Sequence, residues 1–307
     1  MSGRTDRARG VLLGLACGDA LGRPVEFRSA AQIAATHGAL TEMVGDGTWG
    51  QPAGTITDDT AQALCIARSL VARGGFDAAD IAARFLRWLE TEPFDVGRMT
   101  RAALARLGAG EPWQTAGRTV WERAPEGQNA GNGSVMRCAP LAVAYHDDPA
   151  RLTAVSVDSS RITHADPRCT VGCAVLNRTI AGLLTDEPRP LQAALAGVDE
   201  EVPAALHEAL AGLPAGTDPA ALRTSGYVVT TLQTALYDAL SADAFEAAVV
   251  TSVNRGGDTD TIGAVAGAVA GARFGAAAIP ERWLAVLEGR AELEALADAL
   301  LAQATAG

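Results

Sequence analysis

Aromatic residues are scarce in this sequence: Phe, Trp and Tyr make up 5% of its 307 residues, although hydrophobic residues make up 48%. A β-sandwich needs β-branched and aromatic residues in its strands, so this scarcity argues against that class of fold. Alanine and glycine are abundant instead, which favours closely packed helices. Because the hydrophobic content is also ample for a buried core, we predict a globular, all-α fold.

Positive charge is also in deficit. The chain has 25 Lys and Arg residues against 36 Asp and Glu residues, which gives a formal net charge of −11. Such a chain repels polyanions, so we do not expect nucleic acid to be a general partner. A substrate that carries phosphate groups would need bound cations or backbone N–H groups at its site.

The five cysteines do not form a zinc-binding pattern. They are odd in number, and no C-x-x-C or H-x-x-x-H pair accompanies the two that lie closest in the chain, Cys169 and Cys173. Each cysteine lies in an apolar, helical context. We therefore expect reduced thiols in the core of a cytoplasmic protein, and no zinc site.

Long hydrophobic runs are absent as well. The run from Val11 to Cys17 follows three arginines and imitates a secretion signal, but it has seven residues and no A-x-A cleavage site. No run approaches the ~20 residues of a membrane span. We interpret this segment as the first helix of a protein that does not enter a membrane.

The rest of the chain has helical periodicity with short polar breaks. Helices are predicted over about 60–73, 77–89, 97–108, 134–146, 149–160, 167–183, 189–197, 203–212, 227–240, 243–253, 261–274 and 280–303. A long loop is expected from Gly108 to Asn132. There is no βαβ alternation, internal repeat or low-complexity linker, so residues 1–307 are interpreted as a single domain.

Two stripes of glycine stand out, because in each of them glycine recurs at every fourth residue, close to one helical turn. The first stripe is Gly10, Gly14, Gly18 and Gly22, and the second is Gly263, Gly267, Gly271 and Gly275. We predict that the two helices pack closely against each other along these stripes.

Two groups of acidic and hydroxyl residues each open an apolar helix, and the second group directly precedes the second glycine stripe. Thr57-Asp58-Asp59-Thr60 follows a turn at Pro52-Ala53-Gly54, and Asp258-Thr259-Asp260-Thr261 follows Gly256-Gly257. Carboxylate and hydroxyl oxygens suit Mg²⁺ or Mn²⁺, so we predict that the two groups meet around such ions. The alternative is that Asp258 and Thr259 merely cap the second helix, and the same ambiguity applies to Thr57, Asp58 and Asp59 at the first.

The geometry of the second acidic group points to a turn. Side chains two residues apart on a helix diverge by about 200°, so Asp258 and Asp260 can share an ion only where the chain enters the helix. The N–H groups of Gly256 and Gly257 would then face an anion.

The loop Gly131-Asn132-Gly133-Ser134 is a third candidate. Its backbone could bind a phosphate, and Ser134 could cap the helix that follows. An ordinary turn is the alternative. His164, at a helix junction, is a candidate ligand contact or a structural histidine.

Five segments, taken in order, are far more specific than any of them alone. They are Gly14-Leu15-Ala16-Cys17-Gly18-Asp19-Ala20-Leu21-Gly22 with Glu26, Thr57-Asp58-Asp59-Thr60, Gly131-Asn132-Gly133-Ser134-Val135-Met136-Arg137, Thr163-His164, and Asn254-Arg255-Gly256-Gly257-Asp258-Thr259-Asp260-Thr261-Ile262-Gly263. Over nearly the whole chain they resemble the ADP-ribosylglycohydrolase family. Its members include the dinitrogenase reductase-activating glycohydrolase and the hydrolases of ADP-ribosylarginine and ADP-ribosylserine.

The resemblance implies an orthogonal bundle of α-helices that holds two Mg²⁺ or Mn²⁺ ions. The metal ligands that it implies are Thr57, Asp58, Asp59, Asp258, Asp260 and Thr261. Glu26 would lie at the mouth of the metal site. The implied contacts to the substrate are Gly131, Asn132, Gly133, Ser134, His164, Tyr227, Gly256 and Gly257, with Tyr227 near the adenosine end.

The implied reaction is hydrolysis of a glycosidic bond to ADP-ribose. Two cations would orient the ribose hydroxyls and a water molecule, while the carboxylates of Asp58 and Asp59 would stabilise a positively charged transition state. The water's proton would go to Glu26 or Asp59, and the sequence does not separate them.

The acceptor is open at this point. Asp95 resembles a position at which a carboxylate could bind a guanidinium leaving group, which favours ADP-ribosylarginine on a protein, although Asp95 could instead cap a helix. Serine-linked, phosphate-linked and O-acyl ADP-ribose are alternatives, as is a non-catalytic ADP-ribose-binding protein. An isoprenoid-synthase-like enzyme is disfavoured, because Gln62 stands where its acidic motif needs a third Asp. The oligomeric state is not defined by the sequence.

Overall fold

The computed structural model describes residues 3–125, 127–198 and 201–304. In these residues the secondary structure is helical apart from three isolated β-bridges, which confirms the all-α prediction. The α-helices are α1 (Gly3–Gly22), α2 (Ala30–His37), α3 (Asp58–Arg73), α4 (Ala78–Leu89), α5 (Arg98–Gly108), α6 (Trp113–Arg123), α7 (Ala139–Ala144), α8 (Pro149–Arg161), α9 (Pro167–Leu184), α10 (Pro190–Ala196), α11 (Ala204–Leu210), α12 (Val228–Ser241), α13 (Phe245–Asn254), α14 (Thr259–Phe274), α15 (Glu281–Leu284) and α16 (Arg290–Ala304). The 3₁₀ helices are η1 (Arg23–Val25), η2 (Gly47–Trp49), η3 (Pro219–Ala221) and η4 (Ala276–Ala278).

The centre of the fold is the pair α1 and α14, which lie against each other and are almost entirely buried. Their glycine stripes face one another, since a Cβ built on Gly14 would overlap the carbonyl oxygen of Gly267, and one on Gly18 that of Gly263. The same holds for Gly10 and Gly271. The predicted close packing is therefore confirmed. We call this contact the glycine seam.

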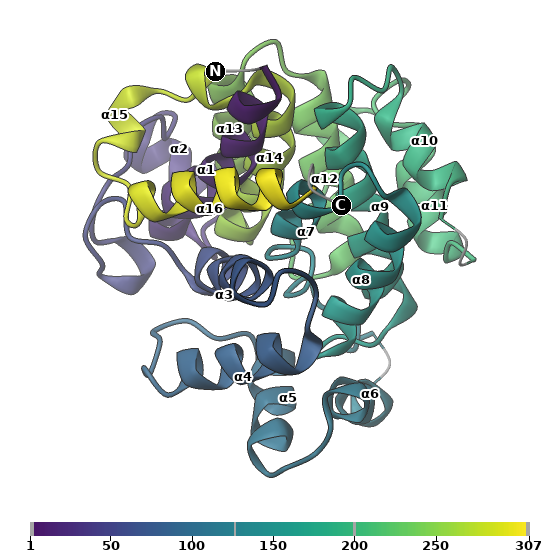
Figure 1. The fold of residues 1–307 in the computed structure, drawn as a ribbon. Coiled ribbons are helices and arrows are strands. Elements are labelled where there is room, and N and C mark those ends of the chain that lie inside the picture. Colours follow the sequence, from purple (N-terminus) through teal and green to yellow (C-terminus); the bar gives the residue numbers. More distant parts are fainter. Residues whose placement is uncertain (1–2, 126, 199–200, 305–307) are drawn as a thin grey trace.

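The other helices surround this pair in differing directions. α16 runs across the view in Figure 1, whereas α3 below it is seen nearly along its axis. α9 packs against α8, α10, α12 and α14 on one side. α4, α5 and α6 lie beyond α3, at the bottom of the view (Figure 1). The arrangement is an orthogonal bundle, as expected.

The loop predicted from Gly108 to Asn132 was wrong, because α6 occupies its middle. Glycine and proline in this stretch suggested irregular structure. Gly117 instead lies within the helix, where a Cβ would overlap the carbonyl oxygen of Arg161 in α8. This glycine serves close packing and does not break the helix.

Two further helix boundaries differ from the prediction. The helix expected from 134 begins only at Ala139, with Pro140 in its first turn, where a missing N–H costs nothing. The helix expected over 280–303 is split into α15 and α16. Gly289 between them adopts a left-handed conformation with φ of 72°, and the N–H of Glu288 donates to the carbonyl of Gly54 at 3.0 Å.

Two further expectations, on membrane spans and on the cysteines, can be compared with the described residues. No helix among them is long and apolar enough to cross a membrane. All five cysteines are free and buried in the core.

Candidate functional site

A cleft of about 750 Å³ opens beside the first turns of α3, α5 and α14, a size typical of ligand sites. Most of the predicted site residues line it. Those that line it are Glu26, Asp58, Asp59, Asp95, Gly131, Asn132, Gly133, His164, Tyr227, Gly257, Asp258, Asp260 and Thr261.

The two acidic groups meet in this cleft, as predicted. The Thr261 hydroxyl donates to Asp59 Oδ1 at 3.4 Å across 202 residues of sequence. Glu26, Asp258 and Asp260 each place one oxygen within 4.8 Å of the other two. The glycine seam explains the meeting, because it fixes the C-terminus of α1 against Thr259 at the start of α14.

The capping alternative is wrong for Asp258 and confirmed for Thr57. Asp258 is the N-cap of α14, but its side chain makes no capping hydrogen bond. Its Oδ2 instead accepts from Asn132 Nδ2 at 2.8 Å, which directs the carboxylate into the cleft. The Thr57 hydroxyl does cap α3, accepting from the N–H of Asp59 at 3.3 Å.

Asp19 is a site residue to which the sequence patterns assigned no role. It is fully buried in α1, and its carboxylate accepts from the N–H groups of Thr57 at 3.0 Å and Thr60 at 3.2 Å. Burial raises the pKa of Asp19 to about 6. The residue orients the acidic turn of α3, and an isolated acid within an apolar glycine-striped helix is the signal that could have revealed it.

Glu26 is held at the edge of the acidic cluster by a tryptophan. Its Oε2 accepts from Trp49 Nε1 at 2.6 Å, which leaves Oε1 for a ligand. Burial, followed by the negative charge of Asp95, raises the pKa of Glu26 to about 8. The loop that carries Trp49 is fixed by buried Arg23, whose guanidinium donates to five backbone carbonyls between Val44 and Thr55.

The chemistry of this cluster suits a hard metal cation. Burial and then mutual repulsion raise the pKa of Asp58, Asp59 and Asp260 well above the usual range. The cluster has five carboxylates, those of Glu26, Asp58, Asp59, Asp258 and Asp260. The side chains that donate hydrogen bonds to them are neutral and belong to Trp49, Gln62, Asn132 and Thr261. Asp59 Oδ2 is buried without a hydrogen-bond partner among the described residues. Buried carboxylates in this state are neutralised by protons or by a bound cation, and an all-oxygen donor set could hold Mg²⁺ or Mn²⁺.

We expect the chelator-treated protein to lose stability as the pH rises from 6.5 to 8. A folded-state pKa near 8 for Glu26 means that the folded form holds a proton that the unfolded form has released. Stability therefore falls through this window, by about 2 kcal/mol. Added Mg²⁺ should raise the melting temperature more at pH 8 than at pH 6.5, because protons then compete less. Thermal unfolding measures both effects.

NaCl at matched ionic strength is the control for that experiment, because it screens charges without binding as a ligand. A melting temperature that is flat or rising from pH 6.5 to 8 in chelator would contradict the expectation. His164 does not blur this window, since burial and the charge of Arg137 lower its pKa to about 3, and its own cost to stability is felt only below about pH 6.5.

A buried relay connects Asp58 with His164. Gln62 Nε2 donates to Asp58 Oδ2 at 3.0 Å, and Gln62 Oε1 accepts from Arg137. The same guanidinium donates to the Thr163 hydroxyl at 2.7 Å. Thr163 in turn lies 2.7 Å from His164 Nδ1. Because Thr163 accepts from Arg137, its proton goes to Nδ1, and the imidazole keeps its proton on Nε2.

This relay makes His164 a neutral donor in the cleft. The ring packs against Gly133, where a Cβ would come within 2.9 Å of Cε1. Arg137 is fully buried and lies over the Phe85 ring, 4.5 Å from its centroid. The patterns assigned no role to Arg137 or Gln62, although a basic residue after a glycine loop is a visible signal.

Thr163→Val is expected to weaken ADP-ribose binding about tenfold, because His164 loses the hydrogen bond that fixes its tautomer. The free energy of unfolding should fall by about 1–3 kcal/mol, since one N–H of Arg137 loses its acceptor. Calorimetry and thermal unfolding measure these changes. Thr179→Val is the matched control, because this buried hydroxyl bonds only its own helix, at Val175 O. Equal effects of the two substitutions on binding would refute the relay.

Gly256 and Gly257 do not offer the backbone donors that were predicted. The N–H of Gly256 donates to Val253 O at 3.3 Å and that of Gly257 to Arg28 O at 2.8 Å, so neither is free for an anion. Ser134 does not cap α7 and does not line the cleft. It is buried, and its hydroxyl accepts from Ser160 at 2.9 Å.

The N-terminus of α5 is an anion site that the patterns did not indicate. Gly97 is its N-cap without a side-chain cap, so Asp95 does not cap this helix and that alternative is wrong. Arg98 is exposed and lines the cleft. The Thr100 hydroxyl also lines it and is buried without a partner among the described residues. A helix N-terminus without a side-chain cap, next to a cation, suits a phosphate.

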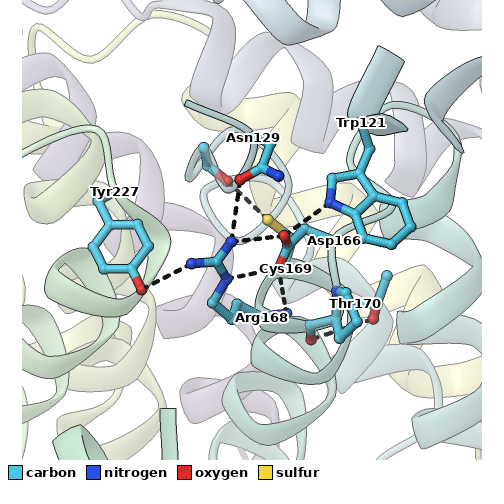
Figure 2. A network of polar contacts seen from close by, with 9 residues as sticks. Trp121, Asn129, Asp166, Arg168, Cys169, Thr170 and Tyr227 are labelled. Carbon is cyan, nitrogen blue, oxygen red and sulfur yellow. Dashed lines mark hydrogen bonds and ion pairs between the residues drawn. The ribbon is translucent and has the colours of Figure 1, made fainter. Parts of the chain in front are cut away.

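A polar network fixes Tyr227 at the far part of the cleft, as Figure 2 shows. Arg168 donates to the Tyr227 hydroxyl at 3.3 Å and to Asn129 Oδ1 at 3.1 Å. Asp166 holds the guanidinium by two hydrogen bonds of 2.8 Å and also accepts from Trp121 Nε1 at 2.9 Å. The tyrosine is therefore held in place and cannot turn freely.

Comparisons with known proteins agree with this geometry. A model of the ADP-ribosylglycohydrolase family matches residues 1–307. The chain is 38% identical over 302 residues to the ADP-ribosyl-[dinitrogen reductase] glycohydrolase of Rhodospirillum rubrum, covering 97% of each chain. It is 32% identical over 321 residues to the ADP-ribosylarginine hydrolase Tri1 of Pseudomonas putida (strain GB-1), covering 97% of this chain and 79% of that one. A solved structure described as an ADP-ribosylglycohydrolase-related protein complex is similar with a TM-score of 0.84 and 39% identity, over 99% of this chain and 100% of that chain.

Proposed function

The chain belongs to the ADP-ribosylglycohydrolase family and is a hydrolase, and from this premise we propose that it cleaves the bond between ADP-ribose and an arginine side chain of a protein. The observation that carries the proposal is the meeting of acidic residues from both ends of the chain beside Asp95 in one cleft. We also propose that residues 1–307 form one domain, because this site needs both ends.

The proposed metal ligands would hold two Mg²⁺ or Mn²⁺ ions. They are Thr57, Asp58, Asp59, Asp258, Asp260 and Thr261. Their oxygen donors support the assignment, as do the raised pKa values of Asp58, Asp59 and Asp260. When bound, such ions would orient the ribose hydroxyls and lower the pKa of a water molecule.

Glu26 is the proposed general base. Trp49 donates a hydrogen bond to one of its oxygens, and the residue lines the cleft. Burial raises its pKa to about 8, near the operating range of a catalytic base. In the step, the water oxygen bonds to the anomeric carbon as the C–N bond breaks. The bond's electron pair stays on the guanidine nitrogen, and the water's proton passes to Glu26.

The rest of the cleft would hold the ADP-ribose moiety. His164 Nε2–H, Arg98 and the N-terminus of α5 supply donors for the diphosphate. Gly131 and Gly133 allow close approach, Asn132 holds Asp258, and Tyr227 offers an aromatic face for the adenosine end.

Asp95 is the proposed contact for the leaving guanidinium. It lines the cleft, and burial, followed by the charges of Asp19 and Asp258, raises its pKa to about 6. A carboxylate in this setting gains from an adjacent cation. The names of the two relatives, which refer to dinitrogen reductase and to ADP-ribosylarginine, support the same acceptor class.

A panel of substrates tests the proposal. Arginine-, serine- and phosphate-linked ADP-ribose and an O-acyl ester would each be incubated with Mg²⁺, Mn²⁺ or EDTA, and release of ADP-ribose measured. We expect metal-dependent release, fastest from the arginine conjugate. Tight binding of ADP-ribose in chelator without release from any conjugate would instead identify a non-catalytic binding protein.

A further inference from the structure

Three aromatic side chains form a continuous surface beside Glu26 and Asp95. Trp49 contacts Phe27 with ring centroids 6.3 Å apart and an interplanar angle of 65°. It contacts Phe94 at 5.7 Å with an angle of 49°. We call Phe27, Trp49 and Phe94 the aromatic rim.

The rim is exposed in a way that packing does not explain. Phe27 is 69% exposed and Phe94 is 36% exposed, and with Val286 they are the large exposed hydrophobic residues of the described chain. Phe27 also has a positive φ of 64°, which is costly for an aromatic residue. Its N–H is tied to Gly257 O at 2.7 Å, next to the second acidic group. Strained backbone and exposed aromatic surface both favour a binding role.

Carboxylates adjoin the rim. The Trp49 indole N–H is bonded to Glu26, Asp95 directly follows Phe94 in the chain, and the protein as a whole carries a formal net charge of −11. Aromatic faces next to carboxylates attract cations, and a planar guanidinium can stack on a ring while it bonds a carboxylate. This combination repels a phosphate group.

We propose that the aromatic rim receives the arginine side chain and the flanking polypeptide of the ADP-ribosylated protein, and so selects cationic acceptors. This inference rests on the proposed function. The ADP-ribose moiety occupies the cleft on the inner side of Glu26. The rim contacts only the other side of the scissile bond, which is the arginine side chain and its polypeptide. Substrate choice then depends on an aromatic surface at the edge of the cleft, where Phe27 belongs to the lining and Trp49 and Phe94 do not.

Exposed rim residues can be exchanged without disturbing Glu26. Phe27→Leu and Phe94→Leu are each expected to lower kcat/KM for an ADP-ribosylarginine peptide about tenfold, through KM. For Phe94→Leu, hydrolysis of a phosphate-linked ADP-ribose and calorimetric binding of ADP-ribose with Mg²⁺ should stay unchanged, because Phe94 does not line the cleft. Phe94→Trp, which keeps an aromatic face, should keep the rate. Val286→Ala is the control, because Val286 is 46% exposed and does not line the cleft.

Each other outcome overturns the proposal in a distinct way. Unchanged kcat/KM on the peptide, or an equal loss on all substrates, would show that the rim does not read the acceptor. A change in mass by light scattering with unchanged KM would show that a second copy of the chain covers the rim. A wild-type protein that cleaves no conjugate would contradict the proposed function itself. An active wild type with unaffected variants would contradict only the proposed role of the aromatic rim.

Discussion

Asp260→Asn is expected to reduce turnover by about 10³-fold while leaving the protein folded. Asp260 is buried in the first turn of α14, among the acidic residues proposed to hold the metal ions. A metal-assisted site supplies several kcal/mol of transition-state stabilisation, and about 4 kcal/mol corresponds to this factor. The asparagine keeps Oδ1, which accepts the N–H of Thr261 at 2.8 Å, so the helix start is preserved.

Stability should move in the opposite direction to activity. Burial and the charges of Glu26 and Asp59 raise the pKa of Asp260, so an amide relieves repulsion in the chelator-treated protein. We expect the variant in EDTA to melt no lower than the wild type, and to gain less from Mg²⁺. Thermal unfolding with and without Mg²⁺, beside single-turnover assays, measures the three quantities.

Asp186→Asn is the matched control for that change. Asp186 is an exposed partner of Arg7 with a positive φ of 61°, a conformation that asparagine tolerates. This variant should keep wild-type turnover and metal response. An Asp260→Asn protein that is unfolded, or that retains full activity, would contradict the role of the acidic cluster.

Gly267→Leu is expected to lose stability and activity together. A Cβ on Gly267 would overlap the carbonyl oxygen of Gly14, which belongs to helix backbone and cannot turn away as a side chain can. Overpacking of this kind costs at least about 3 kcal/mol. Forcing α1 and α14 apart also separates Glu26 and the start of α3 from Asp258 and Asp260. Chemical denaturation and turnover of the purified variant measure the two losses.

Gly108→Ala is the control for that substitution. Gly108 is also helical, at the end of α5, but it is exposed, and a Cβ there would meet Leu86 Cδ2 at an ordinary contact distance of 3.7 Å. Its stability should change by no more than about 1 kcal/mol. A fully active and equally stable Gly267→Leu variant would show that the glycine seam does not set the site.

The sequence predicted structure well where a residue type at a given spacing has a single physical explanation. Glycine at every fourth position has a clear meaning in a helix without a membrane, and it predicted the packing of α1 on α14. Paired acids after glycine turns predicted a shared cluster, because buried carboxylates require partners. The ordered segments then connected these features with a family.

Features that depend on tertiary contacts were not predictable in this way. Gly117 was interpreted as a loop residue, since only the nearness of the Arg161 carbonyl shows why glycine is needed within α6. The apolar run after Ser134 suggested a helix, but Arg137 in this run has to reach both Gln62 and Thr163. The chain forms turns there, and the helix starts at Ala139.

Hydrogen-bond donors were the other source of error. Gly256 and Gly257 were expected to offer N–H groups to an anion, but Val253 and Arg28 accept them. A sequence shows which residues have donors and not which donors are already engaged. The uncapped α5 helix and the unpartnered Thr100 hydroxyl became visible only when the neighbours were known.

The glycine seam also determines which parts of the site can move. Backbone lies directly on backbone along α1 and α14, with no flexible side chains between them, so the two helices behave as one rigid body. The distance between the acidic residues at the start of α14 and the acidic turn of α3, which Asp19 of α1 holds, is therefore fixed. Any movement of the cleft around a ligand must therefore come from segments outside the seam, such as the one that carries Phe94 and Asp95.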